Sequence, residues 1–209
     1  MVKMVLNLVV IGVLSGVILS GVFHAADPLI QANREKELKE AIFLVLPEAK
    51  DYRTVEKTIG KEKFTVYIGV DAAGEPVGVA FKADGGGFQG NIAIMVGMGL
   101  DYLKLKGIKV LEQLETPGLG NRISEPAFEG QFKGVDVKPK IEYIKNRKPE
   151  KPNQIQAITG ATISSNAVVT NINNAIAKVV SSFPADEIRK AAHEQKHEGA
   201  GKKEAGDGK

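Results

Sequence analysis

The sequence predicts an α+β protein, with a single N-terminal transmembrane helix followed by one domain that has a mainly antiparallel, twisted sheet flanked by helices. Three patterns support this prediction. Residues 4–23 carry no charge. Residues 64–70 and 76–81 carry a large apolar side chain at every second position on either side of a turn, as the strands of a hairpin do. Residues 164–183 repeat apolar side chains every three or four positions, as an amphipathic helix does.

The uncharged N-terminal stretch is long enough for a membrane span, because about twenty helical residues cross the roughly 30 Å hydrocarbon core. A cleaved signal peptide is the alternative, and it needs small residues one and three positions before the cut. A cut after Ala25 would place Phe23 at the upstream position, and a cut one residue later would place His24 there. We therefore interpret residues 1–26 as a retained anchor. Basic residues flank the span on both sides, so their count does not decide its orientation.

The remaining elements follow from periodicity and from turn residues. In chain order we expect a helix over 27–50, strands over 64–70, 76–81, 91–99 and 106–113, a short helix over 125–132, short strands at 135–137, 141–144 and 155–158, and a long helix over 164–183. The folded domain is thus predicted to cover residues 27–183. Residues 184–209 are charged and rich in glycine, which predicts a solvated, disordered tail.

The composition excludes several kinds of site. The chain has no cysteine, which rules out disulfides, thiolate zinc sites and cysteine-ligated iron–sulfur clusters. Its three histidines, His24, His193 and His197, lie beside the anchor or in the tail, so we expect no folded metal site. A net charge of +3, from 28 basic and 25 acidic residues, is too even to indicate nucleic-acid binding. Redox chemistry in this chain would need an organic cofactor.

The run Thr159-Gly160-Ala161-Thr162 lies where a predicted strand gives way to the long helix. A helix N-terminus offers unpaired N–H groups and a partial positive charge to a phosphate, and the two small central residues let a ligand approach the backbone. Ser164 and Ser165 follow and supply further hydroxyls. Taken alone, the run leaves open the more common interpretation that one of these serines only caps the helix.

A second run, Glu115-Thr116-Pro117-Gly118-Leu119-Gly120, predicts a tight turn with exposed backbone amides. Such a turn could lie against a flat ring, with Leu119 giving an apolar contact. Taken alone, it also fits an ordinary turn between a strand and a helix. A glycine-rich run at 85–90 is not a dinucleotide-binding motif, because no strand–Gly-x-Gly-x-x-Gly–helix unit surrounds it.

Together the two runs resemble the covalent FMN-binding domain found in the G subunit of Rnf complexes and in the C subunit of sodium-pumping quinone reductases. The Ser/Thr-Gly-Ala-Thr motif of the family matches 159–162, and its Glu-Thr-Pro-Gly-Leu-Gly loop matches 115–120. The resemblance covers roughly residues 33–183 together with the anchor. One departure is Gln156, where the family often has aspartate.

The resemblance implies that Thr162 carries one FMN through a phosphoester, installed by a flavin transferase that uses FAD. The other residues implied at the site are Thr159, Gly160, Ala161, Ser164, Ser165, Glu115, Thr116, Gly118 and Leu119. No catalytic residue and no metal ligand is implied.

The resemblance and the short chain imply an FMN-carrying electron-relay subunit of a membrane-bound Rnf complex, which couples electron transfer between ferredoxin and NAD to ion translocation. They further imply an accessory redox role, a domain on the extracytoplasmic side of the plasma (inner) membrane, and contacts with other Rnf subunits, especially the D subunit in the membrane. Two alternatives stay open. One is a stand-alone membrane-anchored flavodomain that serves another reductase or a sensor, and the other is a membrane-tethered interaction protein without a flavin.

Overall fold

The computed structural model describes residues 2–192, and the chain divides into two units with a border between Lys39 and Glu40. Helix α1 (Val2–Val45) is one continuous helix, and it is long and apolar enough to cross a membrane by length and composition. The sequence predicted an anchor over 1–26 and a separate helix over 27–50. The predicted domain border after residue 26 therefore lies inside α1.

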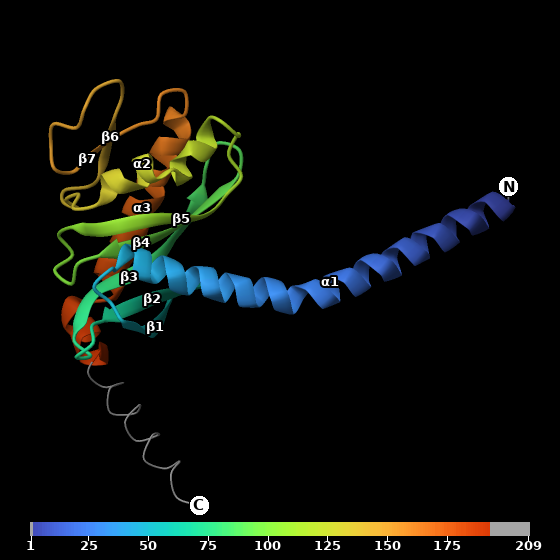
Figure 1. Ribbon diagram of the computed structural model, residues 1–209, viewed down its shortest axis with the longest axis horizontal. Coiled ribbons are helices and arrows are strands. Elements are labelled where there is room, and N and C mark those ends of the chain that lie inside the picture. Colours follow the sequence, from blue (N-terminus) through green and yellow to red (C-terminus); the bar gives the residue numbers. More distant parts are fainter. Residues whose placement is uncertain (1, 193–209) are drawn as a thin grey trace, which may run out of the picture. The chain divides into compact units, whose positions relative to one another are not determined.

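The unit that begins at Glu40 is built on a five-stranded antiparallel sheet (Figure 1). Its strands lie in the order of the sequence: β1 (Asp51–Ile59), β2 (Glu62–Val70), β3 (Pro76–Gly86), β4 (Asn91–Met98) and β5 (Leu105–Gln113). The predicted α+β class with a mainly antiparallel sheet is confirmed.

Strand β1 was not predicted. Only Val55 and Ile59 on its inward side are apolar and pack against the core, whereas Arg53 and Lys57 alternate with them. Charged residues are common on edge strands because they discourage pairing with another chain. Since β1 is an edge of this sheet, its apolar pattern is too incomplete to reveal a strand.

Helix α3 (Thr162–Ser182) packs on one face of the sheet (Figure 1). Val168 and Val179 of this helix are buried in a common core with Phe81 of β3. The helix predicted over 164–183 is confirmed to within two residues at its start, because its buried stripe repeats at the helical period.

The end of α1 packs on the other face. Gly97 lies between two core residues of β4, so it faces away from α3. An added Cβ at Gly97 would lie 2.3 Å from the carbonyl oxygen of Val45, and one at Gly78 would lie 2.8 Å from the side chain of Leu46. Glycine at these positions lets the helix end approach the sheet closely.

The shorter elements lie between β5 and α3. They are η1 (Gly120–Ser124), α2 (Pro126–Glu129), η2 (Gly130–Phe132), and the parallel pair β6 (Glu142–Ile144) and β7 (Gln154–Gln156). The short helix predicted over 125–132 is present as α2 and η2. The strand predicted at 135–137 is wrong, because only an isolated bridge between Lys104 and Asp136 forms there.

The fold continues beyond the predicted end of the domain at residue 183. Residues 185–192 are helical, and Ile188 and Ala192 are buried in the core. The prediction of a disordered tail is therefore wrong for this segment, whose two buried residues lie one helical turn apart among charged neighbours. Residues 193–209, with His193 and His197, lie outside the described part of the chain.

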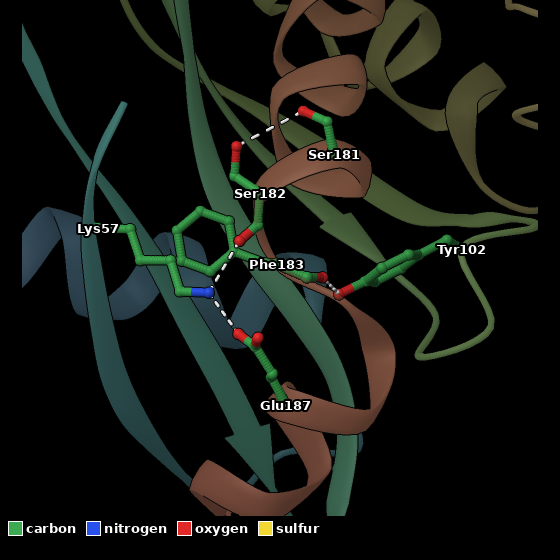
Figure 2. A network of polar contacts seen from close by, with 6 residues as sticks. All are labelled: Lys57, Tyr102, Ser181, Ser182, Phe183 and Glu187. Carbon is green, nitrogen blue, oxygen red and sulfur yellow. Dashed lines mark hydrogen bonds and ion pairs between the residues drawn. The ribbon is translucent and has the colours of Figure 1, made fainter. Parts of the chain in front are cut away.

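Contacts around Phe183 fasten the C-terminal end of α3 to the sheet (Figure 2). The carbonyl of Phe183 accepts a hydrogen bond from the Tyr102 hydroxyl at 2.8 Å, and the carbonyl of Ser182 accepts one from Lys57 Nζ at 2.9 Å. Lys57 also pairs with Glu187, and its Nζ lies 5.3 Å from the centroid of the Phe183 ring. Burial raises the pKa of Tyr102 to about 12.

Candidate functional site

Both sequence motifs line one cavity of about 330 Å³. Three segments far apart in the sequence meet there: the loop after β3, the loop after β5 and the start of α3. The lining residues are Phe88, Glu115, Thr116, Leu119, Gly120, Gly160, Ala161, Thr162, Ile163 and Ser164. The structure thus brings together most of the site residues that the sequence predicted.

The first turn of α3 has no side-chain cap. The helix begins at Thr162, its N-cap residue is Ala161, and no side-chain hydrogen bond caps it within residues 2–192. The interpretation that Ser164 or Ser165 caps the helix is therefore wrong. The first turn keeps its N–H groups and its partial positive charge for an anion.

The loop before α3 is held by Ser165 and by a left-handed glycine. The Ser165 hydroxyl accepts a hydrogen bond from the N–H of Ile158 at 3.0 Å and donates one to the carbonyl of Ala161 at 3.0 Å. Gly160 has a φ of 84°, a conformation that side chains other than glycine rarely adopt. Both features fix the position at which the Thr162 side chain leaves the backbone.

Glu115 joins the three segments. It is only 4% exposed, and its Oε1 accepts hydrogen bonds from the N–H of Phe88 at 2.8 Å and of Gln89 at 3.0 Å. Its Oε2 accepts a hydrogen bond from the Ser164 hydroxyl. An added Cβ at Gly87 would lie 2.4 Å from Oε1, so glycine there allows the carboxylate to approach the loop. One buried carboxylate thus links the loop after β5, on which it lies, to the loop after β3 and to the start of α3.

Two opposing effects set the pKa of Glu115. Burial raises it, because a carboxylate loses its hydration. Hydrogen bonds from Ser164 and from the backbone N–H groups of Gln89, Phe88 and Gly90 lower it, and the net pKa is lower than usual. Glu115 is therefore ionised at neutral pH, and its negative charge beside the first turn of α3 is favourable with the helix dipole.

Three apolar side chains stand exposed at this cavity: Phe88 (61%), Leu119 (50%) and Ile163 (59%). Exposed apolar groups gathered at one cavity are typical of a ligand-binding surface. Together with the uncapped helix start, they suit a ligand that has an anionic phosphate at one end and a flat apolar ring at the other. FMN has both parts, so the residues present fit this group.

Three of the predicted site residues lie outside the cavity lining. Thr159 lines a neighbouring cavity of about 250 Å³ with Arg122 and Gln131. Gly118 has a φ of 75° and donates its N–H to Asn121 Oδ1 at 2.8 Å, so it shapes the turn. The third, Ser165, is the buried residue that holds the loop.

Three lining residues were not predicted as site residues, namely Phe88, Gly120 and Ile163. Phe88 follows the glycine-rich run at 85–87, which matches no dinucleotide-binding motif. Its proximity to Glu115 could have been inferred only with the strand pairing known. Gly120 is the last residue of the first recognised motif and Ile163 directly follows the second, so both lie close to residues that were predicted.

Comparisons with known proteins agree with this geometry. Residues 87–177 match the FMN-binding domain family, and this range contains the whole cavity lining. The G subunit of the ion-translocating oxidoreductase complex of Methanosarcina acetivorans is 32% identical over 178 residues, which cover 83% of this chain and 92% of that protein. The G subunit of the Na⁺-translocating ferredoxin:NAD⁺ oxidoreductase complex of Acetobacterium woodii is 37% identical over 150 residues, which cover 69% of this chain and 70% of that protein.

The fold is shared with a solved structure. The crystal structure of the C subunit of the Na⁺-translocating NADH-quinone reductase from Parabacteroides distasonis superposes with a TM-score of 0.59 at 21% identity, covering 72% of this chain and 94% of that chain. At that identity the similarity establishes the fold alone. The sequence relatives establish more, and the chain belongs to the family of G subunits of ion-translocating, Rnf-type oxidoreductase complexes, with an FMN-binding domain at residues 87–177.

Proposed function

We propose that this chain is the FMN-carrying electron-relay subunit of a membrane-bound Rnf complex, in which electron transfer between ferredoxin and NAD is coupled to ion translocation. The observation that carries the proposal is the position of Thr162. It is the first residue of an uncapped helix, and it lines a cavity whose wall is held by Glu115. The relative from Methanosarcina acetivorans is the G subunit of an ion-translocating oxidoreductase complex, and the one from Acetobacterium woodii is the G subunit of a Na⁺-translocating ferredoxin:NAD⁺ oxidoreductase complex.

The FMN is joined through its phosphate to the hydroxyl of Thr162. A phosphate on this oxygen lies at the N-terminus of α3, where backbone N–H groups and the helix dipole favour negative charge. In the attachment step the Thr162 hydroxyl would form a bond to the FMN phosphorus of FAD as the phosphoanhydride bond to AMP breaks, so that AMP would leave and the hydroxyl proton would be released to solvent. A flavin transferase catalyses this step as a maturation partner.

The chain's own residues bind and orient the cofactor. Bound FMN supplies reversible uptake of electrons. Phe88, Leu119 and Ile163 offer apolar contacts to its ring, and Glu115 fixes the loop that carries Phe88. Glu115 is ionised and already accepts hydrogen bonds from Phe88, Gln89 and Ser164, so it positions the loop and has no proton to donate. This assigns the chain an accessory redox role, without acid–base catalysis of its own.

The domain lies on the extracytoplasmic side of the plasma (inner) membrane and is held there by α1 as a single span. Its partners are the other Rnf subunits, especially the D subunit in the membrane. The length and apolar composition of α1 support the anchor. The orientation can be tested by fusing to the C-terminus a reporter that works only in the cytoplasm. Activity of this reporter would contradict the orientation.

Intact-mass measurement of the protein purified from its native membrane tests the attachment. The expected mass exceeds that of the polypeptide by one FMN less one water, and the added mass lies in the peptide that contains Thr162. An unmodified mass would overturn the covalent attachment. A flavinylated chain that never copurifies with other Rnf subunits would instead favour the stand-alone flavodomain.

A further inference from the structure

The five-stranded sheet is split over part of its length. Strands β2 and β3 pair from Val66–Phe81 to Val70–Pro76. Before Val66, residues 62–65 of β2 pair only with β1, and after Phe81, residues 82–86 of β3 pair only with β4. A cavity of about 580 Å³, which we call the sheet cleft, opens between these two strand segments and is larger than the cavity at Thr162.

The walls of the sheet cleft are strand edges with free backbone groups. In an antiparallel ladder, successive residues direct their N–H and C=O groups to opposite neighbours. The Val70 carbonyl bonds on the β1 side, with Lys50 N–H at 2.7 Å, so even-numbered residues of β2 face β1 and Lys63 and Thr65 face the cleft. The N–H of Gly87 bonds to Gly90 in the β3–β4 connection, so Lys82 and Asp84 face the cleft from the other side.

These four residues are among those that line the cleft. No strand pairs with the free edges within residues 2–192. The two edges therefore offer donors and acceptors in alternation, which is the pattern that an extended peptide presents on both of its own edges.

A buried side-chain amide without a hydrogen-bond partner within residues 2–192 lies at the base of the cleft. Asn171 of α3 is 7% exposed, and its Nδ2 has no hydrogen-bond partner in the described part of the chain. It lies directly against β3, since an added Cβ at Gly85 would lie 2.2 Å from its Oδ1. Buried side-chain donors are almost always paired, so this Nδ2 is placed to donate to an acceptor in the cleft, such as a peptide carbonyl.

The charges of the cleft do not favour a small ion. Lys178 pairs with Glu62 at 3.4 Å and Lys82 pairs with Asp84 at 3.2 Å, and the third lysine in the lining, Lys63, pairs with Glu56 of β1, so each cation at the cleft already has a carboxylate partner. The groups left to recognise a ligand are therefore the backbone edges and the Asn171 amide. This combination fits a neutral extended backbone better than a free phosphate or carboxylate.

We propose that the sheet cleft binds an extended segment of a neighbouring subunit, which adds a strand between the free edges of β2 and β3. This inference rests on the proposed function, because the neighbour is a subunit of the same complex. Four residues of a strand span about 13 Å, which matches the four unpaired residues of β2. The free edge of β3 leads directly into the loop of Phe88 and thus to the cavity at Thr162.

Single cysteines test the occupancy, because the chain has none of its own. Asn174→Cys places a thiol on an exposed position of α3 that lines the cleft, and Ala177→Cys is a matched exposed position on the same helix outside it. Maleimide labelling is compared between the isolated chain and the purified complex. We expect Asn174→Cys to react at least about tenfold more slowly in the complex and Ala177→Cys to change little, as local protection predicts.

Hydrogen exchange at the amides of Lys82 and Asp84 identifies the occupant as a strand. We expect both amides to exchange more slowly in the complex than in the isolated chain. Equal labelling of Asn174→Cys in the two forms, or unchanged exchange at these amides, overturns the inference. Copurification and covalent flavin are scored on the same samples: a chain that carries flavin and assembles with an open cleft contradicts this inference alone, whereas a chain that assembles with none of the other subunits contradicts the proposed function as well.

Discussion

The two ends of α3 differ in how their backbone groups are satisfied. At the N-terminal end, Thr162 begins the helix without a side-chain cap beside a cavity. At the C-terminal end, the carbonyls of Ser182 and Phe183 accept hydrogen bonds from Lys57 and Tyr102, and the Lys57 cation lies where the helix dipole is negative (Figure 2). The same helix therefore has one end with donors left for a ligand and one end with its acceptors engaged by the protein.

The N-terminal end of α3 is thus suited to ligand binding, whereas its C-terminal end contributes to the stability of the fold. A binding site needs groups that the protein itself does not pair, and such groups weaken the local structure until the ligand arrives. Contacts at the far end of α3, and the buried stripe between Val168 and Val179, hold the helix independently of the ligand. Substitutions at the two ends should therefore have separable effects, one on flavin content and the other on unfolding.

The largest expected effect is at Thr162. Thr162→Ala removes the acceptor hydroxyl, so the flavin fluorescence that resists denaturation should disappear from this band on a denaturing gel. The free energy of unfolding of the flavin-free domain should change by about 1 kcal/mol or less, because one hydroxyl at a helix start is lost. Thr162→Ser keeps the oxygen but loses the methyl group that restricts its rotamer, so labelling should fall without vanishing.

Thr159→Ala is the matched control, because Thr159 faces the neighbouring cavity and not the one at Thr162. Its covalent flavin should persist. Covalent flavin in Thr162→Ala would show that Thr162 is not the acceptor. Thr159, Ser164 and Ser165 would then be the hydroxyls to examine.

The second effect concerns Glu115, which holds the functional end together. Glu115→Ala leaves the N–H groups of Phe88 and Gln89 without their acceptor, so we expect a loss of roughly 2–3 kcal/mol in stability and a reduced flavin content. Glu112→Ala, at an exposed position near the end of β5, should change stability by less than about 0.5 kcal/mol. Chemical denaturation with flavin absorbance in parallel measures both quantities.

The pH dependence of the free energy of unfolding tests the role of the Glu115 charge independently. Its pKa is lower in the folded state than in the unfolded chain, so the ionised form stabilises the fold above the ordinary glutamate pKa, and this contribution is lost as the pH falls below that value. The stability difference between the parent and Glu115→Gln should therefore shrink on acidification. A difference that stays constant with pH would show that the charge of Glu115 does not matter.

Sequence patterns predicted the features that are contained within one continuous stretch of the chain. The α3 stripe repeats within one element, and both motifs are contiguous, so the chain alone was enough to locate them. The role of Glu115 was not accessible in this way, because its partners Gln89, Phe88 and Ser164 lie 26 to 49 residues away. The helix at 185–192 was missed for a related reason: only two of its residues are fully buried, and their charged neighbours dominate the local composition.

At the stabilising end, Tyr102→Phe should lower the free energy of unfolding by about 1 kcal/mol at neutral pH, because the carbonyl of Phe183 loses its donor. Burial raises the pKa of Tyr102 to about 12, so the neutral phenol stabilises the fold below the ordinary tyrosine pKa near 10, and this contribution is lost as the pH rises through 12. The phenylalanine variant should lack this alkaline loss. Tyr143→Phe, at a half-buried position, is the control.

The smallest effect is expected at Lys57, and it tests whether the two ends are independent. The Lys57 side chain is 37% exposed, so solvent screens its pair with Glu187, and Lys57→Met should cost only about 0.5–1 kcal/mol. The part of that cost due to the ion pair should vanish at high salt, whereas the part due to the lost hydrogen bond to the Ser182 carbonyl should persist. Flavin content should equal that of the parent, because about 30 Å of helix separates the two ends. A fall in covalent flavin in a well-folded Lys57→Met variant would mean that the C-terminal contacts help to set the position of Thr162, and the two ends would then have to be treated as one coupled unit.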